Sequence, residues 1–338
     1  MLSDARAYRL EEGVLLIETL IGLEIHTKVS DVMKVFSGPC GGVWPIDEGL
    51  PGSLPTFQPK ELNFMFELIV FACCDIATCL SFTRKSYNCI DIALGYQITQ
   101  CFWPIASNGI LSVHRSNSLG KGDMLRIRLL RFNIEHDSAN FTSTKRYVSY
   151  LRAGISLLEI VTAPDLDSPS NVRVALVKLK LLLKTIGLCL DVTTVRFDLN
   201  YTLAKPLSSL SRKVELKNIS CFGSIDRLLN IAMLSLPRSL TKPLTCDHGN
   251  KIVIATRAKD HDHDYKRIQE SNLNVTKVWY PMIKAVPMIE NDILAFADAS
   301  AYVTQNVMLL GVLGFKRIVI ALKVSETKTN RLSLQERS

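Results

Sequence analysis

The chain has 338 residues, which is long enough for one large domain or two of ordinary size. Its 40 Lys and Arg residues outnumber 32 Asp and Glu, and the net charge of +8 favours a polyanionic partner without identifying one. Nine cysteines form no CxxC pair, so neither a zinc ribbon nor a dithiol redox motif is expected, and the odd count suggests a reducing compartment.

The first third of the chain has the pattern of short strands joined by turns. Apolar runs alternate with Gly and Pro from Val14 to about Arg131, and one helix-like insertion interrupts them at about 60–80. Two longer strands are predicted at 109–114 and 125–136, on either side of a polar loop.

A buried strand and a long helix are predicted in the middle of the chain. The strand covers 156–161 and the helix covers 167–187. Ser168 can cap this helix, Pro169 suits its first turn, and Gly187 can end it.

A strand at 213–218 and a helix at 224–236 follow, and the pattern weakens beyond Leu273. Because strands and helices do not alternate as in βαβ units, we predict an α+β fold built on an antiparallel sheet. The apolar windows at 64–82 and 303–322 contain charged residues, so we expect buried helices there and no membrane span.

Common signatures for nucleotide binding and hydrolysis are absent from the sequence. It has no GxxxxGK[ST] phosphate loop, no HExxH helix, no nucleophile elbow and no GxGxxG after a strand. Any chemistry must therefore come from scattered acidic residues and histidines.

Glu24 and His26 stand two residues apart in the apolar run IGLEIH, so a strand would aim both at one face. They are either a solvated strand face or a pair of metal ligands. A second group, Glu135, His136 and Asp137, closes the strand at 125–136.

Glu159 lies inside the apolar strand SLLEIV, where a carboxylate needs water at a sheet edge or a bound partner. The mixed tract KDHDHDYKR at 259–267 is either a cation site or a solvated loop. Hard oxygen ligands with one imidazole suit divalent-cation chemistry, which leaves phosphoryl transfer and metal-assisted hydrolysis both open.

Eight short segments of the chain occur in the order, and near the spacing, of one protein family. They are IGLEIH, KVFSG, GLPGSLP, TRKSY, GYQITQ, LRAGISLLEIVTAPDLDSP, KVELKN and HDY. Together they resemble the B subunit of the aspartyl/glutamyl-tRNA amidotransferase, over residues 15–273.

The resemblance implies a fold and a division into regions. It implies a cradle-shaped catalytic domain, similar to that of glutamine synthetase, on an antiparallel sheet at 15–273. An N-terminal extension would cover 1–14. Residues 274–338 would form a truncated, mostly helical C-terminal region, too short to include the tail domain of the family.

The resemblance also implies an activity. Such a protein forms a heterotrimer with an amidase-type A subunit and a small C-type or equivalent subunit, and converts Glu-tRNA(Gln) into Gln-tRNA(Gln). It uses ATP and Mg²⁺ to phosphorylate the tRNA-bound glutamate, which is then amidated with ammonia from the A subunit. The chain would thus be part of a carbon–nitrogen ligase with glutamine as amido donor. Eukaryotic members imply a mitochondrial location.

Carried over position by position, the resemblance implies a catalytic and metal-binding group and a larger set lining the cradle. The catalytic residues would be Glu24, His26, Glu135 and Glu159, and the metal ligands would be these four and His136. The substrate, tRNA and ATP contacts would be Arg84, Lys85, Tyr87, Tyr96, Gln97, Gln100, Arg152, Arg196, Asp198, Lys217, Asn218, His263, Asp264 and Tyr265.

The chain departs from the family pattern in ways that bear on activity. His136 stands where the family has a second carboxylate, which puts metal affinity in doubt. The segment MEEGS is missing before Arg196, and the family's zinc-binding cysteine pairs are reduced to Cys40, so no zinc is expected. Two alternatives therefore remain: a scaffold or tRNA-binding subunit that has lost phosphorylation, and an RNA-binding protein on the same fold.

Overall fold

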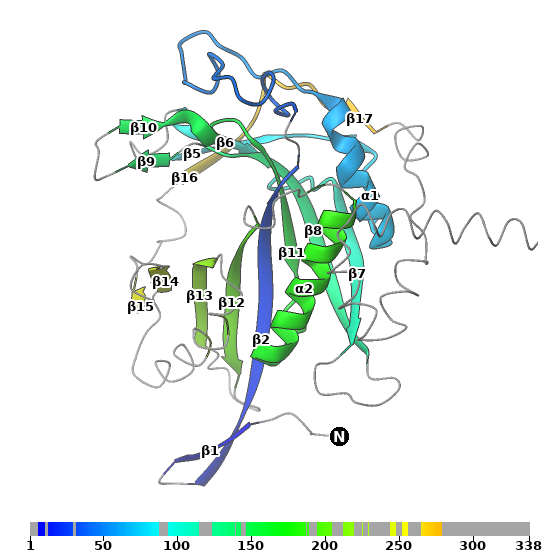
Figure 1. Ribbon diagram of the computed structural model, residues 1–338, viewed down its shortest axis with the longest axis vertical. Helices are drawn as coiled ribbons and strands as arrows, with labels where there is room; N and C mark the ends of the chain where they lie inside the picture. Colours follow the sequence, from blue (N-terminus) through cyan, green and yellow to red (C-terminus); the bar gives the residue numbers. More distant parts are fainter. Residues whose placement is uncertain are drawn as a thin grey trace, which may run out of the picture.

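A computed structural model describes residues 6–10, 13–29, 32–87, 94–114, 124–138, 140–142, 147–186, 188, 195–204, 212–219, 225, 229, 244–247, 252–255 and 265–278. Its main feature is a ten-stranded sheet in the order β15-β14-β13-β12-β2-β11-β8-β7-β3, with β1 paired to β2 (Figure 1). In chain order its strands are β1 (Arg6–Leu10), β2 (Gly13–Lys28), β3 (Asp75–Ile76), β7 (Ala106–His114), β8 (Met124–His136), β11 (Ser156–Thr162), β12 (Arg196–Ala204), β13 (Arg212–Ile219), β14 (Leu244–Asp247) and β15 (Ile252–Ala255).

The neighbouring strands of this sheet run antiparallel, apart from β13 and β14, which pair in parallel. The predicted antiparallel sheet is therefore confirmed. Three smaller sheets are formed by β16-β5-β6, β9-β10 and β4-β17. Their strands are β4 (Cys79–Leu80), β5 (Thr83–Tyr87), β6 (Tyr96–Thr99), β9 (Asn140–Thr142), β10 (Tyr147–Ser149), β16 (Tyr265–Gln269) and β17 (Thr276–Lys277).

Helices are few among the described residues. Those with described bounds are two 3₁₀ turns, η1 (Pro59–Leu62) and η2 (Tyr150–Arg152), and two α-helices, α1 (Asn63–Phe71) and α2 (Pro169–Thr185). None of them is long and apolar enough to cross a membrane.

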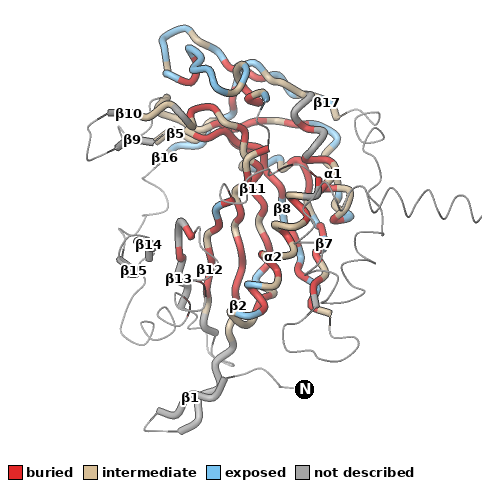
Figure 2. The backbone as a smooth tube through the Cα atoms, viewed as in Figure 1, coloured by how far each residue is buried: buried red, intermediate tan, exposed pale blue. Residues whose placement is uncertain are grey.

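Strand alternation gives the large sheet two different faces. On β2, Ile21, Leu23 and Ile25 are at most 3% exposed, whereas Glu24 and His26, which alternate with Leu23 and Ile25, are only partly buried. The apolar side chains belong to one hydrophobic cluster with buried residues of α2, which lies over this core face of the sheet (Figures 1 and 2). We call the opposite face, which bears Glu24 and His26, the site face.

Helix α2 begins as its sequence predicts. The Ser168 hydroxyl accepts a hydrogen bond from the Asn171 backbone N–H at 3.4 Å, and Pro169 occupies the first turn, where its missing N–H leaves no bond unmade. Buried residues recur at helical spacing along the helix, from Val172 through Leu176 and Leu179 to Leu183. The predicted end, Gly187, lies outside the described residues.

The other predicted elements are mostly found. The strands expected at 109–114, 125–136, 156–161 and 213–218 lie in β7, β8, β11 and β13. The helix expected at about 60–80 is shorter, because Cys73 adopts a positive φ of 52° and the chain then enters β3 and β4.

Two predictions fall mostly outside the described residues. Of the helix predicted at 224–236, only Ile225 and Leu229 are described; both are α-helical, as predicted, and both are fully buried. Of the helical region predicted at 274–338, only 274–278 is described, and it contains β17. The helical character of that region stays a prediction.

Candidate metal centre

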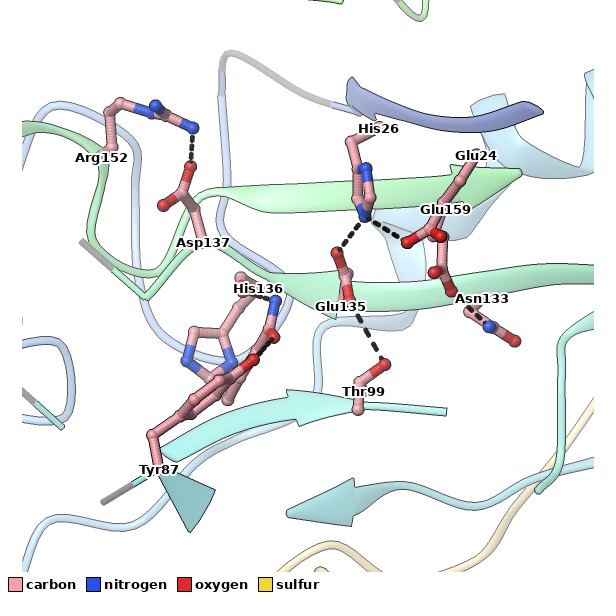
Figure 3. Close-up of polar contacts among 11 residues, drawn as sticks. Glu24, His26, Tyr87, Thr99, Asn133, Glu135, His136, Asp137, Arg152 and Glu159 are labelled. Carbon is pink, nitrogen blue, oxygen red and sulfur yellow. Dashed lines mark hydrogen bonds and ion pairs between the residues drawn. The ribbon is translucent and has the colours of Figure 1, made fainter. Parts of the chain in front are cut away.

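Three adjacent strands bring the predicted metal-binding residues together. Strand β11 lies between β2 and β8, and the Cα of Glu159 is opposite His26 on one side and Asn133 on the other. Because paired residues of antiparallel strands point to the same face, these side chains share the site face. Glu24 and Glu135 lie two residues along from His26 and Asn133, so they join the same group (Figure 3).

The side chains approach one another closely enough to share a cation. One carboxylate oxygen each from Glu24 and Glu159 and a ring nitrogen of His26 lie within 4.8 Å of one another. His26 Nε2 is 3.1 Å from Glu135 Oε1 and 3.8 Å from Glu24 Oε1. We call these four residues the acidic cluster.

Neighbouring polar groups hold two of the carboxylates in place. The Asn133 amide donates a hydrogen bond of 2.5 Å to Glu159 Oε2. The Thr99 hydroxyl donates one of 3.3 Å to Glu135 Oε2. Asn133 and Thr99 are both buried. Each therefore fixes one oxygen of its carboxylate on the side away from the cluster, and the second oxygen of that carboxylate is left to face the cluster (Figure 3).

The acidic cluster carries an excess of negative charge. Burial alone would lower the pKa of His26, but its hydrogen bond to Glu135 and the charges of Glu135, Glu159 and Glu24 raise it to about 9. The proton on His26 thus offsets part of the carboxylate charge in the metal-free protein. Oxygen-rich donors with one imidazole fit Mg²⁺, for which carboxylates are preferred ligands.

Strand β12 adds two more predicted residues beside the cluster. The Cα atoms of Arg196 and Asp198 lie opposite those of His26 and Glu24. Arg196 is exposed and Asp198 is partly buried on the site face. Lys217 and Asn218 lie in β13, but their side chains are not described. Tyr265 is the first residue of β16. His263 and Asp264 lie outside the described residues.

His136 is not brought into the acidic cluster. It follows Glu135 directly on β8, so the strand turns it to the opposite face. Its Nδ1 accepts a hydrogen bond of 2.9 Å from the Ile98 backbone N–H, and its ring packs edge-on against Phe36. Burial lowers its pKa to about 4, so the ring is neutral at physiological pH. The histidine at this position therefore removes no ligand from the cluster.

Four consecutive residues at the end of β6 bind the end of β8. Gln97 Nε2 donates to the His136 carbonyl at 3.0 Å, the Ile98 N–H donates to the His136 ring, and the Thr99 hydroxyl donates to Glu135. Gln100 Oε1 accepts from the Ile134 N–H at 2.9 Å. We call residues 97–100 the β6 clamp. Gln97 and Gln100, two of the predicted substrate-contact residues, thus hydrogen-bond to β8 in this structure.

Four of the remaining predicted contact residues form two cation–aromatic pairs. Arg84 lies 4.0 Å above the Tyr96 ring and binds Glu270 through two nitrogens, at 2.7 and 2.9 Å. This bidentate bond raises the pKa of Arg84. Lys85 lies 5.3 Å from the centre of the Tyr87 ring.

The Tyr87 hydroxyl donates to Gln97 Oε1 at 3.0 Å. Arg152 is apart from the cluster and pairs with Asp137, beyond the end of β8 (Figure 3).

The sequence reasoning missed three residues of this region. Asn133 and Thr99 orient carboxylates of the cluster, and Glu270 anchors Arg84. The sequence alone could have predicted Asn133 as a site residue, because it precedes Glu135 by two residues and so shares its face of the strand. Thr99 and Glu270 depend on contacts between distant segments, for which the sequence offers no local signal.

The sequence matches a known protein family over most of its length. The profile described as the GatB/GatE catalytic domain matches residues 19–284. The B subunit of the aspartyl/glutamyl-tRNA(Asn/Gln) amidotransferase from Carboxydothermus hydrogenoformans is 27% identical over 297 residues, covering 79% of this chain and 61% of that protein.

The proteins of the same name from Oceanobacillus iheyensis and Clostridium tetani are 31% and 30% identical, over 76% and 75% of the chain. In both cases the match covers 57% of the relative. The chain thus spans about three fifths of the length of these relatives. All of the acidic cluster lies inside the matched range, and the chain belongs to the GatB/GatE catalytic-domain family.

Proposed function

We propose that the chain is the B subunit of a glutamyl-tRNA(Gln) amidotransferase that acts in mitochondrial translation. The observation that supports this most is the acidic cluster, which combines Glu24, His26, Glu135 and Glu159 on one face of a sheet within the family match. The curated relatives carry the name of the same kind of subunit. The partners would be an amidase-type A subunit and a small C-type subunit.

The residues fit a bound Mg²⁺. Glu24, Glu159 and His26 would hold the ion, and Glu135 would join them, because the His26 nitrogen that faces Glu24 and Glu135 carries no proton once it binds the ion. The ion would neutralise phosphate charge, which is the main requirement of phosphoryl transfer. The chain itself supplies the fixed orientation, since Asn133 and Thr99 already hold two of the carboxylates.

The proposed reaction has two steps. A carboxylate oxygen of the tRNA-bound glutamate attacks the γ-phosphorus of ATP, so that an acyl phosphate forms and ADP leaves. Ammonia, released from glutamine in the A subunit, then attacks the acyl carbon. The carbon–oxygen bond breaks, and phosphate leaves with one proton from the ammonia. Gln-tRNA(Gln) is the product.

Reconstitution tests this proposal. The chain is assembled with its A-type and C-type subunits and supplied with Glu-tRNA(Gln), glutamine, MgCl₂ and γ-labelled ATP. We expect label in the tRNA-linked glutamate when glutamine is withheld, and Gln-tRNA when it is present. Glu24→Gln and Glu159→Gln should reduce both by at least about 100-fold. Glu48→Gln, an exposed carboxylate in the turn after Asp47, is the matched control.

Two outcomes would contradict the proposal. If ATP consumption by an active complex is unchanged by Glu24→Gln, the site is misassigned. If the wild-type complex assembles and retains tRNA but neither consumes ATP nor forms Gln-tRNA, the chain is the non-catalytic scaffold that its departures from the family leave open.

A further inference from the structure

A small cavity lies beside the end of β8, on the side to which His136 points and opposite Glu135. Its wall is formed by the end of β8, the β6 clamp, the turn at 153–154 and residues 36–47, with Leu94 at its edge. Leu94 and Ser138 are partly exposed, and the other eight residues of the wall are buried. The space open to the centre of a water molecule is about 10 Å³. One water needs about this much room, and an organic molecule needs far more.

His136 contributes a buried polar atom to this wall. Its Nδ1 accepts the Ile98 N–H and therefore carries no proton, so the neutral ring has its hydrogen on Nε2. Nε2 is buried and has no hydrogen-bond partner among the described residues. Because an unmet buried donor costs free energy, we expect an acceptor in the cavity.

The carboxylate of Asp47 lies on the same wall. Its Oδ2 accepts hydrogen bonds from Lys34 Nζ at 2.5 Å and from the Trp44 N–H at 3.1 Å. Its Oδ1 lies against Gly154, so close that a Cβ at that position would overlap it. Gly154 also has a φ of 75°, which other residues rarely adopt. The glycine thus leaves room for this oxygen at the cavity wall.

The charges around the cavity are balanced by the protein itself. Lys34 pairs with Asp47, and Arg152 pairs with Asp137, the second carboxylate of the wall. A cation would meet the N–H of His136, and an anion would meet two carboxylates, so neither suits this cavity. A water molecule does suit it, because water both accepts and donates hydrogen bonds.

We propose that this cavity binds one ordered water molecule, which accepts the Nε2–H of His136 and donates a hydrogen bond to Asp47 Oδ1. The water joins the end of β8 to the Lys34–Asp47 pair. The site is separate from the acidic cluster, which lies on the opposite face of β8. It does not depend on which reaction the chain catalyses.

Nuclear magnetic resonance of the full chain tests the contact directly. The six histidines are labelled with ¹⁵N in a deuterated chain, and the signal that is missing from His136→Gln is assigned to His136. We expect its hydrogen on Nε2, with a rotating-frame cross peak to water whose sign indicates dipolar contact and not chemical exchange. A hydrogen on Nδ1, or an Nε2 proton without this cross peak, would overturn the proposal.

The number of long-lived waters tests the role of the donor, and ¹⁷O relaxation dispersion of the solvent measures it. His136→Phe removes the donor, so we expect it to bind one long-lived water fewer than the wild-type chain. His136→Gln should keep that water, because its amide can place an N–H near the position of Nε2. His114→Phe is the matched control and should also keep it, since His114 ends β7 opposite Met124, at the far end of β8 from His136. Thermal unfolding shows that each variant is folded.

The outcomes decide the proposal in either direction. If a folded His136→Phe variant keeps the water count of the wild type, His136 does not hold a water and the proposal is wrong. If His136→Gln loses the water as well, the shape of the ring holds it and the proposed hydrogen bond is wrong. If His136→Phe does not fold, the cross peak of the wild-type chain decides alone. No measurement here uses ATP or tRNA, so the water site and the proposed function can fail separately.

Discussion

The two faces of the large sheet carry side chains of opposite character on the same strands: buried apolar groups on one face and clustered charged groups on the other. On the core face, Ile25, Ile160 and Phe197 are fully buried and gain stability from the removal of apolar surface from water. On the site face, Glu24, Glu135 and Glu159 crowd negative charges together, which opposes folding and is offset only in part by the proton on His26. Alternate residues of one strand therefore serve different purposes, stability on the core face and chemistry on the site face. Substitutions on the core face should mainly lower the free energy of unfolding, and those on the site face should mainly change metal binding.

The largest effect is expected on the core face. Phe197→Ala removes a fully buried ring from β12 and should lower the free energy of unfolding by about 3–5 kcal/mol. Urea unfolding followed by circular dichroism measures this. Arg196→Ala, the exposed neighbour on the site face, is the control and should change it by less than about 0.5 kcal/mol. Equal losses in both variants would contradict the division of the faces.

On the site face, the next largest effect should depend on metal. Saturating Mg²⁺ at about 100 times its dissociation constant should stabilise the wild-type chain by roughly 2.7 kcal/mol. Glu159→Gln should lose most of this gain, yet should be no less stable than wild type in EDTA, because it relieves repulsion. Thermal unfolding with and without MgCl₂ tests both statements. A variant that is strongly destabilised in EDTA would show that Glu159 has a structural role instead.

The two histidines should give opposite pH dependences. The folded-state pKa of His136 is lowered to about 4, so the unfolded state binds its proton first as the pH falls. Its contribution to stability is complete above about pH 6.5 and is lost between there and pH 4, by at most about 3 kcal/mol. His136→Gln should flatten the acid limb of unfolding free energy against pH. An unchanged limb would mean that other groups cause it.

The smaller pH effect belongs to His26, which is less enclosed. Its folded-state pKa is raised to about 9, so in the metal-free protein its stabilising contribution is complete below about pH 6.5. That contribution is lost as the pH rises through 9. Urea unfolding in EDTA between about pH 6 and 10 should show a decline that His26→Gln lacks. A parallel decline in the variant would exclude His26 as its source.

Local patterns in the sequence predicted most of the strands that carry the site. Alternation located β2, β8 and β11, and it placed Glu24 and His26 on one face before any partner was known. It would also have separated Glu135 from His136, but the family motif suggested that both were ligands. The backbone period decides the matter, because neighbours in a strand cannot face the same way.

What the sequence could not supply is the register between strands. The pairing of Glu159 with His26 and Asn133 depends on how three segments align over more than 100 residues of chain. The same is true of Glu270, which lies 186 residues from its partner Arg84. Such contacts are selected by the packing of the whole domain and leave no local trace.

The β6 clamp makes the amide of Ile98 a natural reporter. Its proton is held by an imidazole nitrogen rather than by a carbonyl, so its nuclear magnetic resonance frequency should respond directly to the state of that ring. The same residue is backbone-paired with Arg84 in the β16-β5-β6 sheet. The Ile98 amide resonance can therefore show whether the β16-β5-β6 sheet stays in contact with β8 of the large sheet when RNA, nucleotide or metal binds and dissociates.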